Sequence, residues 1–171
     1  MSVIVCDTRE KKTAHITDYF DEKGLKWVRS KLYVGDYSLL DNMSVCVDRK
    51  KDLQEVYGNL IGKKPHIRFR EEADRARESG IRLVILVEDG TIDRLEDVHR
   101  WNNRRIWQYR MMLKRGETPK FKEPIPSATL QKIMERFAEV HGVEWRFCKK
   151  NETAKTILEL LNYEEGDYGR D

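Results

Sequence analysis

The sequence predicts an α/β domain built on a mixed central sheet. Short strand-like apolar runs alternate with segments of helical spacing, and three consecutive strand-like segments in the first third form a meander. The near-continuous apolar run Ile81–Val87 predicts a strand with cover on both sheet faces. The last three elements are too few to bury a core of their own. We therefore expect one domain over residues 1–163 and a flexible tail over 164–171.

The first half of the chain is expected to open with a strand and a helix that Gly24 ends, followed by the antiparallel meander. A turn at Asp41 and Asn42 joins the last two strands of that meander. In order, the expected elements are strand Val3–Asp7, helix Thr13–Glu22, strands Leu25–Leu32, Asp36–Leu40 and Met43–Asp48, and helices Asp52–Leu60 and Ile67–Ser79.

The second half continues from strand Ile81–Val87 through a polar loop, a helix and a proline-containing linker. Ser127 is expected to cap the N-terminus of the next helix, and Gly142 to end it. The expected elements are helices Arg104–Arg115 and Ser127–His141, strand Val143–Cys148 and helix Glu152–Leu161.

Composition limits the class of protein more than it identifies a function. The formal net charge is only +3, so the field of the whole protein does not indicate a nucleic-acid binder. No apolar run approaches the roughly 20 residues that span a bilayer, and we expect a cytoplasmic protein without a membrane partner. The cysteines Cys6, Cys46 and Cys148 sit singly in apolar segments and are expected to be reduced core thiols.

Two carboxylates and a lysine are expected to meet at one end of the sheet. Asp48 and Lys50 lie two residues apart on one strand, so their side chains share a face. Asp36 begins the partner strand, and antiparallel pairing brings it near Asp48. Carboxylate oxygens bind Mg²⁺, and the compact ammonium of Lys50 can offset the negative charge that develops on a phosphodiester. For an isolated Asp-x-Lys pattern, an ordinary exposed ion pair is the competing interpretation.

The wider pattern resembles a known family. Asp7-Thr8-Arg9-Glu10, then Val34-Gly35-Asp36-Tyr37 and Val47-Asp48-Arg49-Lys50, occur in this order at strand ends. Together they resemble the XPF-type structure-specific nuclease domain of the PD-(D/E)XK superfamily. The likeness continues through Arg68-Phe69 and the strand Leu83 to Glu88, so it covers about the first 90 residues.

The resemblance implies a restriction-endonuclease-like mixed central sheet flanked by helices, and a Mg²⁺- or Mn²⁺-dependent DNA endonuclease. It implies that Asp36 and Asp48 are the principal metal ligands, with Asp7 and Glu10 as accessory acids. Arg9, Arg49 and Lys50 would be the cationic partners of the scissile phosphate. The implied catalytic set is therefore Asp7, Arg9, Glu10, Asp36, Asp48, Arg49 and Lys50.

Two positions depart from the family pattern. Asp48 stands where the family has glutamate, so the ligand is one methylene shorter. Asp52 follows Lys50 with two fewer intervening residues than the family's aspartate, and the N-cap of the following helix is an equal alternative for it.

The DNA contacts are expected on two helices. Arg68 and Arg70 are candidates, although a solvated charge is the default for an exposed helix face. The basic stretch from Trp101 to Lys122 either packs an aromatic face into the core or contacts phosphates and stacks on bases. Within it, Arg104, Arg105 and Lys114 are expected to touch DNA and Trp107 to lie in the core. His15, His66, His99 and His141 receive no role.

Three functions are compatible with these residues. The first is a metal-dependent endonuclease that cuts branched or single-strand-containing DNA. The second is a catalytically silent DNA-binding module of the same fold, and the third is a Holliday-junction resolvase. Retention of all four acids favours the enzyme. DNA is the expected partner, without a nucleotide cofactor, and both a homodimer and a partner protein remain open.

Overall fold

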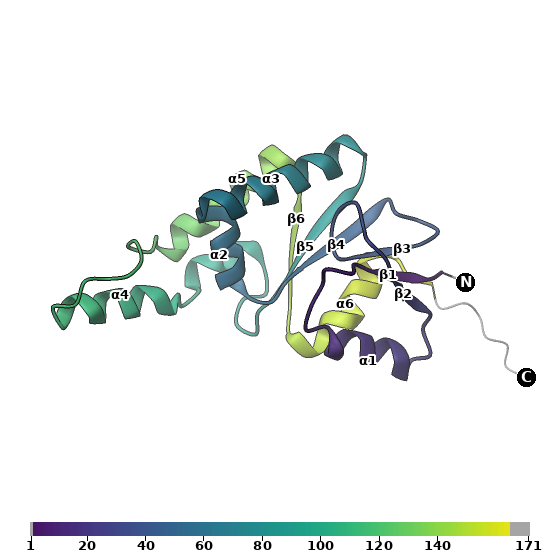
Figure 1. Ribbon diagram of the computed structural model, residues 1–171, viewed down its shortest axis with the longest axis horizontal. Coiled ribbons are helices and arrows are strands. Elements are labelled where there is room, and N and C mark those ends of the chain that lie inside the picture. Colours follow the sequence, from purple (N-terminus) through teal and green to yellow (C-terminus); the bar gives the residue numbers. More distant parts are fainter. Residues whose placement is uncertain (1, 165–171) are drawn as a thin grey trace, which may run out of the picture.

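The computed structural model describes residues 2–164, which form one mixed sheet with helices on both faces (Figure 1). The strand order is β2-β1-β3-β4-β5-β6 among the described residues. The strands are β1 (Ile4–Cys6), β2 (Trp27–Arg29), β3 (Tyr37–Leu39), β4 (Val45–Lys50), β5 (Arg82–Glu88) and β6 (Glu144–Cys148). The predicted α/β class is confirmed.

The helices lie in two layers. They are α1 (Ala14–Glu22), α2 (Leu53–Ile61), α3 (Lys63–Glu78), α4 (Arg104–Lys114), α5 (Ser127–His141) and α6 (Thr153–Leu160), with short 3₁₀ helices η1 (Leu95–Arg100) and η2 (Lys150–Glu152). Helices α2, α3 and α5 cover one sheet face, and α1 and α6 cover the other (Figure 1). Leu83, Ile85 and Val87 of β5 enter the first core, whereas Val84 and Leu86 enter the second. This alternation explains the continuous apolar run.

The predicted three-stranded meander is wrong in one strand. Strand β2 pairs with β1, in parallel, and does not lie beside β3. Helix α1 makes the crossover that a parallel pair requires, so β1, α1 and β2 form a β-α-β unit. The apolar pattern identified β2 as a strand but carried no information about its neighbour. Strand β3 is antiparallel to both β1 and β4, while β4, β5 and β6 run parallel.

The N-cap alternative for Asp52 and the expected helix end at Gly142 are confirmed, whereas the expected cap at Ser127 is wrong. Asp52 caps α2, because its carboxylate accepts a hydrogen bond from the Glu55 amide at 2.7 Å. Gly142 ends α5 in the left-handed conformation, with φ of 72°. Ser127 is the first helical residue of α5 rather than its cap. The Pro126 backbone holds the cap position, and the Ser127 hydroxyl instead donates to the Trp101 carbonyl at 2.6 Å.

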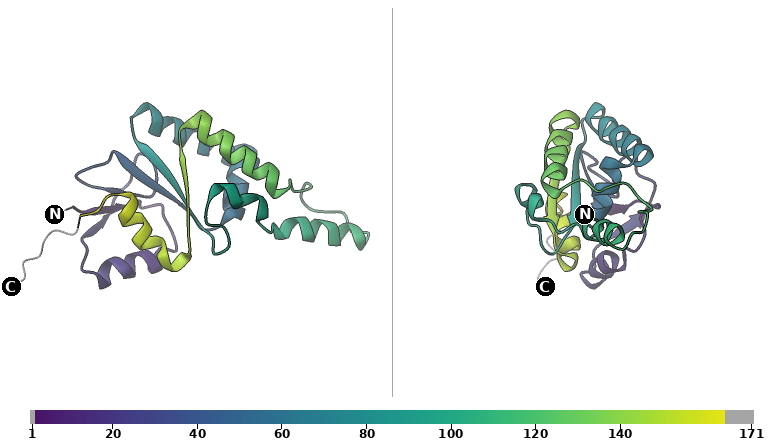
Figure 2. Two further views of the ribbon diagram at one scale, coloured as in Figure 1. Left: turned by 180° about the vertical axis from the view of Figure 1, so that it is seen from behind. Right: turned by 90° about the vertical axis from the view of Figure 1, so that its left-hand side faces the viewer.

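Helix α4 extends beyond the end of the sheet, away from α1 and α6, in both opposite views (Figures 1 and 2). No residue of α4, all of which lies in the described part of the chain, is buried. Trp107 is 63% exposed, so its expected place in the core is wrong. The aromatic spacing of the helix instead places Tyr109 against Phe121, in the segment that follows α4.

Two further expectations concern buried thiols and membrane spans. Cys6, Cys46 and Cys148 are free and buried, as predicted. Within residues 2–164, no helix has the length and apolar character needed to cross a bilayer. Of the expected tail, all but Glu164 lies outside the described residues.

Candidate functional site

Strand β4 delivers its last three side chains to opposite sheet faces. Asp48 and Lys50 point to the side covered by α2 and α3 and are only 4% and 8% exposed. The Lys50 Nζ lies 2.9 Å from Asp48 Oδ2 and 4.9 Å from the centroid of the Phe69 ring. Arg49 faces the other side, toward α1 and α6. The strand therefore supplies an acid and two cations from three consecutive residues.

Asp36 is brought to β4 by the turn that precedes β3. The Asp36 amide donates to the Val47 carbonyl at 2.8 Å, and its Oδ2 accepts from the Arg49 amide at 2.8 Å. Gly35 adopts φ of 71°, and a Cβ there would lie 3.1 Å from the Val47 carbonyl oxygen. Only glycine allows this approach without strain. The Gly-Asp pair thus fixes a carboxylate against the end of β4.

The acids near this strand end destabilise one another's charge. Burial raises the pKa of Asp36 well above its ordinary value, and the neighbouring Asp48 and Glu10 carboxylates raise it further. Burial also raises the pKa of Glu10, against the opposing effect of Arg49. Asp48 Oδ2 is buried, and the Lys50 ammonium 2.9 Å away is its ion-pair partner. The cluster is therefore short of positive charge.

Lys50 remains charged in this environment. Burial disfavours its ammonium, but Asp48 and Asp36 outweigh that effect and hold the pKa of Lys50 above its ordinary value. Its aromatic neighbour adds a favourable cation-π contact.

Asp7 is fully buried and its carboxylate is saturated with donors. It accepts four hydrogen bonds of 2.7 to 2.9 Å, from the amide, Nε and Nη2 of Arg9 and from the Leu32 amide. Burial would raise the pKa of Asp7, but these donors outweigh it and lower the pKa. The hydrogen bonds of Asp7 and Arg9 therefore hold the segment after β1 against the segment after β2.

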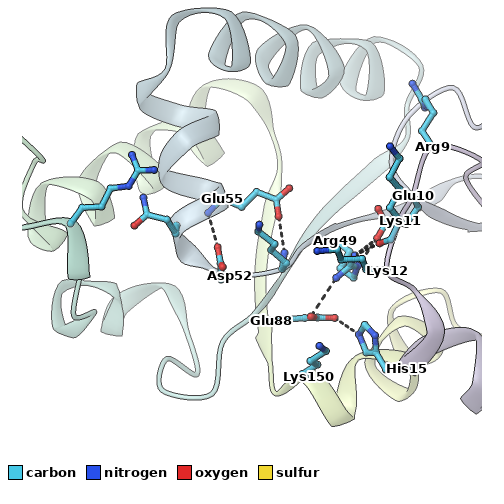
Figure 3. A pocket seen from close by; sticks show the side chains of 13 residues that line it. Arg9, Glu10, Lys11, Lys12, His15, Arg49, Asp52, Glu55, Glu88 and Lys150 are labelled. Atoms are coloured by element: carbon cyan, nitrogen blue, oxygen red, sulfur yellow. Dashed lines mark hydrogen bonds and ion pairs between the residues drawn. The ribbon is translucent and has the colours of Figure 1, made fainter. Parts of the chain in front are cut away.

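A second polar cluster lies on the Arg49 side of the sheet (Figure 3). Arg49 Nε donates to Glu10 at 2.6 Å, and Nη1 lies 3.4 Å from Glu88 Oε2. The other Glu88 oxygen contacts His15 Nε2 at 2.6 Å and accepts from the Thr153 hydroxyl at 2.9 Å. The cluster joins α1, β4, β5 and α6.

Sequence reasoning missed Glu88, His15 and Thr153. The available signal was the position of Glu88, which ends β5 at the same sheet edge as Lys50, because Lys50 pairs with Val87. Acids at the ends of adjacent parallel strands meet at one edge.

Glu72 of α3 was also missed. Its Oε1 accepts a hydrogen bond from the Gly35 amide at 2.9 Å. Burial raises the pKa of Glu72, and the Asp48 carboxylate raises it further. Glu72 lies between Phe69 and Ala76 at helical spacing, within the buried face of α3. A carboxylate on such a face was the signal for a site residue.

The strand end borders two cavities. One, of about 760 Å³, lies on the Arg49 side and is predominantly cationic. It is lined by Arg9, Glu10, Lys11, Lys12, His15, Arg49, Lys51, Asp52, Gln54, Glu55, Glu88, Arg105 and Lys150. The other, of about 360 Å³, is lined by Lys50 together with Arg68, Phe69 and Glu72. Excess cations over a concave surface attract a polyanion.

The candidate DNA contacts lie at different distances from this strand end. Arg105 lines the larger of these two cavities, the cationic cleft of about 760 Å³. Arg104 and Arg105 line an adjoining hollow of about 500 Å³. Arg68 lines the Lys50 cavity, whereas Arg70 and Lys114 are exposed. All five are accessible to a ligand.

The donor set fits a metal held by few protein ligands. Within residues 2–164, no group of three or more His, Cys, Asp or Glu side chains surrounds one position. Asp36 and Asp48 nevertheless present hard carboxylate oxygens close to one another at the end of β4. Mg²⁺ commonly takes one or two carboxylates and completes its shell with water and phosphate. A cation there would relieve the repulsion between the acids.

A family model described as the ERCC4 domain matches residues 6–160. The structure is similar to XPF from Aeropyrum pernix, with a TM-score of 0.61, 20% identity, and coverage of 94% of this chain and 63% of that one. It is also similar to XPF from Aeropyrum pernix in complex with DNA, with a TM-score of 0.58, 19% identity, and coverage of 95% and 64%.

These matches concern a domain rather than a whole protein. The chain spans just under two thirds of the length of the XPF chains that it matches. No curated protein matches it significantly in sequence. The family match covers nearly the whole chain and includes every implied catalytic residue. This chain therefore belongs to the ERCC4 domain family and has the restriction-endonuclease-like fold of an XPF-type nuclease domain.

Proposed function

We propose that this domain is a metal-dependent endonuclease that hydrolyses phosphodiester bonds in DNA. The observation that carries the proposal is the pair Asp36 and Asp48, held together at the end of β4 beside the charged Lys50. Membership of the ERCC4 family supports a DNA substrate, and the XPF structure in complex with DNA supports it further.

In this proposal Asp36 and Asp48 hold Mg²⁺ or Mn²⁺. A cation held by these two acids would polarise the phosphodiester and would make a water nucleophilic near neutral pH. Lys50 stays protonated and offsets the negative charge that develops on the phosphate. The buried Phe69 contact keeps its ammonium in one place.

The remaining candidates bind or position rather than coordinate. Arg49 uses its guanidinium to hold Glu10 and Glu88, and its amide to hold Asp36. It therefore aligns the acids from the other sheet face. The saturated carboxylate of Asp7 has no lone pair left for a metal, so we assign Asp7 and Arg9 to holding the loop. The exposed cations of the cleft, such as Lys51 and Lys150, are suited to backbone phosphates.

The experiment is incubation of labelled duplex, single-stranded, forked and four-way DNA with Mg²⁺, Mn²⁺ or chelator. We expect cutting with either metal and none with chelator, because the acids act only through a cation. Asp36→Asn should abolish cutting, whereas Asp18→Asn, on the exposed surface of α1, should leave it unchanged. Chelator-resistant cutting, or a normal rate in Asp36→Asn, would remove this mechanism.

The silent DNA-binding module makes a different prediction in the same experiment. The observation that favours it is that no position within residues 2–164 is surrounded by three or more metal-ligating side chains. A folded parent that binds every substrate and cuts none would replace the enzyme with this module. A parent that cuts only four-way DNA would instead indicate a junction resolvase.

A further inference from the structure

One face of α4 is covered by the chain's own return segment, residues 116–126. The rings of Tyr109 and Phe121 lie 6.1 Å apart, and the Arg105 guanidinium lies 5.7 Å above the Phe121 ring. Ile106 and Tyr109 line a hollow of about 340 Å³ with residues 123–126. The projecting helix is therefore a supported two-layer arm and not a free helix.

The other face of α4 is open and combines an aromatic ring with cations. Arg104, Trp107 and Lys114 share this face, because residues three and seven apart lie on one side of a helix. All three are exposed, and Trp107 leaves 63% of its area in water. A large exposed indole has lost the burial that normally stabilises it, so it indicates a contact surface.

The open face continues the cleft of the candidate site. The hollow of about 500 Å³ at the base of α4 is lined by Arg104, Arg105 and Gln108. It shares Asp52, Gln54 and Arg105 with the cationic cleft beside Arg49. Figure 3 shows Asp52 at the side of that cleft away from Arg9 and Glu10. A polyanion lying in the cleft would therefore continue onto the arm.

We propose that the open face of α4 is a binding surface for unpaired DNA, in which Trp107 stacks on a base and Arg104 and Lys114 contact the flanking phosphates. In a duplex, the base faces are already stacked on their neighbours, so an exposed indole recognises a strand that has separated. The cations on either side of the ring provide the charge complementarity. The proposal rests on the proposed endonuclease function for its setting, and it adds a binding surface on α4 outside the strand-end site.

The test measures binding by fluorescence anisotropy in chelator, so that no cutting interferes. The probes are a labelled single strand, a duplex of the same length and a forked duplex. Trp107→Ala should weaken binding of the single strand and the fork by roughly tenfold and leave duplex affinity unchanged. Trp107→Phe should keep most of the affinity, because its ring still stacks. Leu113→Ala, on the same helix and 52% exposed, is the matched control.

The salt dependence separates stacking from charge. Trp107→Ala should leave the slope of log affinity against log salt unchanged, because the indole neutralises no phosphate, whereas Lys114→Gln should make it shallower. Equal losses on all three probes, or no loss on any, would overturn the proposal. A parent dimer that Trp107→Ala converts to a monomer in sedimentation, with single-strand affinity unchanged, would show a protein contact instead.

The outcomes also separate this inference from the proposed function. A parent that never cuts, but whose preference for single strands depends on Trp107, would refute the endonuclease and keep the arm. A parent that cuts with Mg²⁺, while Trp107→Ala retains parental affinity for the fork, would keep the endonuclease and refute the arm.

Discussion

The Glu72 carboxylate accepts a hydrogen bond from the Gly35 amide at 2.9 Å, and this contact ties helix α3 to the turn that carries Asp36. Among the hydrogen bonds of the described residues, this is the one that joins an α3 side chain to the turn. Gly35 adopts a left-handed conformation against β4. The orientation of its amide therefore fixes the position of the next residue, Asp36. We therefore regard Glu72 as a positioning residue for Asp36.

Glu72→Ala should lower kcat by roughly tenfold with a smaller effect on KM, because a misplaced ligand affects the chemical step. Glu72→Gln should restore much of the rate, since its amide oxygen can accept the same hydrogen bond. Glu71→Ala changes the exposed neighbour on the same helix and is the control. If Glu72→Ala and Glu72→Gln lost stability without any change of kcat, the role of Glu72 would be structural only.

Asp7 provides a prediction about stability and its dependence on pH. Its donors lower its pKa, so the ionised carboxylate stabilises the fold above the ordinary aspartate pKa of about 3.9. That contribution is lost as pH falls through the lowered pKa of the folded protein. Asp7→Asn should cost about 2 kcal/mol near neutral pH, because one oxygen becomes a donor beside other donors.

Urea unfolding across the acid range measures this effect. The parent should lose more stability than Asp7→Asn as the pH falls below about 4, so the two curves should converge. Parallel curves would mean that Asp7 contributes no ionised-state stabilisation. If Asp7→Asn had the parental free energy of unfolding at neutral pH, Asp7 would not hold the two segments together.

The sequence alone was sufficient to locate the secondary-structure elements, because the local hydrophobic pattern decides them. Period-two and helical spacing located the strands and α-helices, although α3 begins at Lys63, before the predicted start at Ile67. The strand-end acid Asp36 was correctly expected beside Asp48. Local pattern could not decide which strands are neighbours, so β2 was misplaced. It also could not tell a core tryptophan from an exposed one, because Trp107 has the same spacing in either case.

The residues that sequence reasoning missed are those whose partners are distant in the chain. Glu88 meets His15 and Thr153 only after β5 has paired with β4, and Glu72 meets Gly35 across 37 residues. The expected roles of Asp36, Asp48 and Lys50 in catalysis remain predictions. Their geometry makes those predictions specific enough to test.

Charge reversal at the base of α4 tests the electrostatic part of DNA binding. Arg104→Glu with Arg105→Glu should weaken binding to every DNA probe and flatten the salt dependence, because fewer phosphates are neutralised. Anisotropy titrations over a range of salt concentrations measure both quantities. Arg136→Glu, an exposed cation on α5, is the matched control. An unchanged slope would exclude phosphate contacts at these two arginines.

Asp48 is the residue that best separates an enzyme from a binding module. Asp48→Asn removes a negative charge beside Lys50 and keeps the side chain's shape, so DNA binding should persist or tighten while cutting falls by orders of magnitude. Circular dichroism and thermal melting must first show that the variant is folded. A folded Asp48→Asn protein that cuts at the parental rate would remove Asp48 from the site.

Asp48→Glu tests whether the site is built around the shorter acid. Asp48 is 4% exposed, and its carboxylate already lies 2.9 Å from the Lys50 ammonium, so one more methylene must displace that ammonium or the strand. We expect a folded protein that cuts roughly tenfold more slowly than the parent, because the acid and the lysine lose their relative placement. The comparison uses matched rates with Mg²⁺ and with Mn²⁺, and Asp18→Glu on the surface of α1 as the control. A parental or faster rate would show that the site accepts the longer acid of the family pattern; the adjoining cavity of about 360 Å³ offers room for a displaced Lys50.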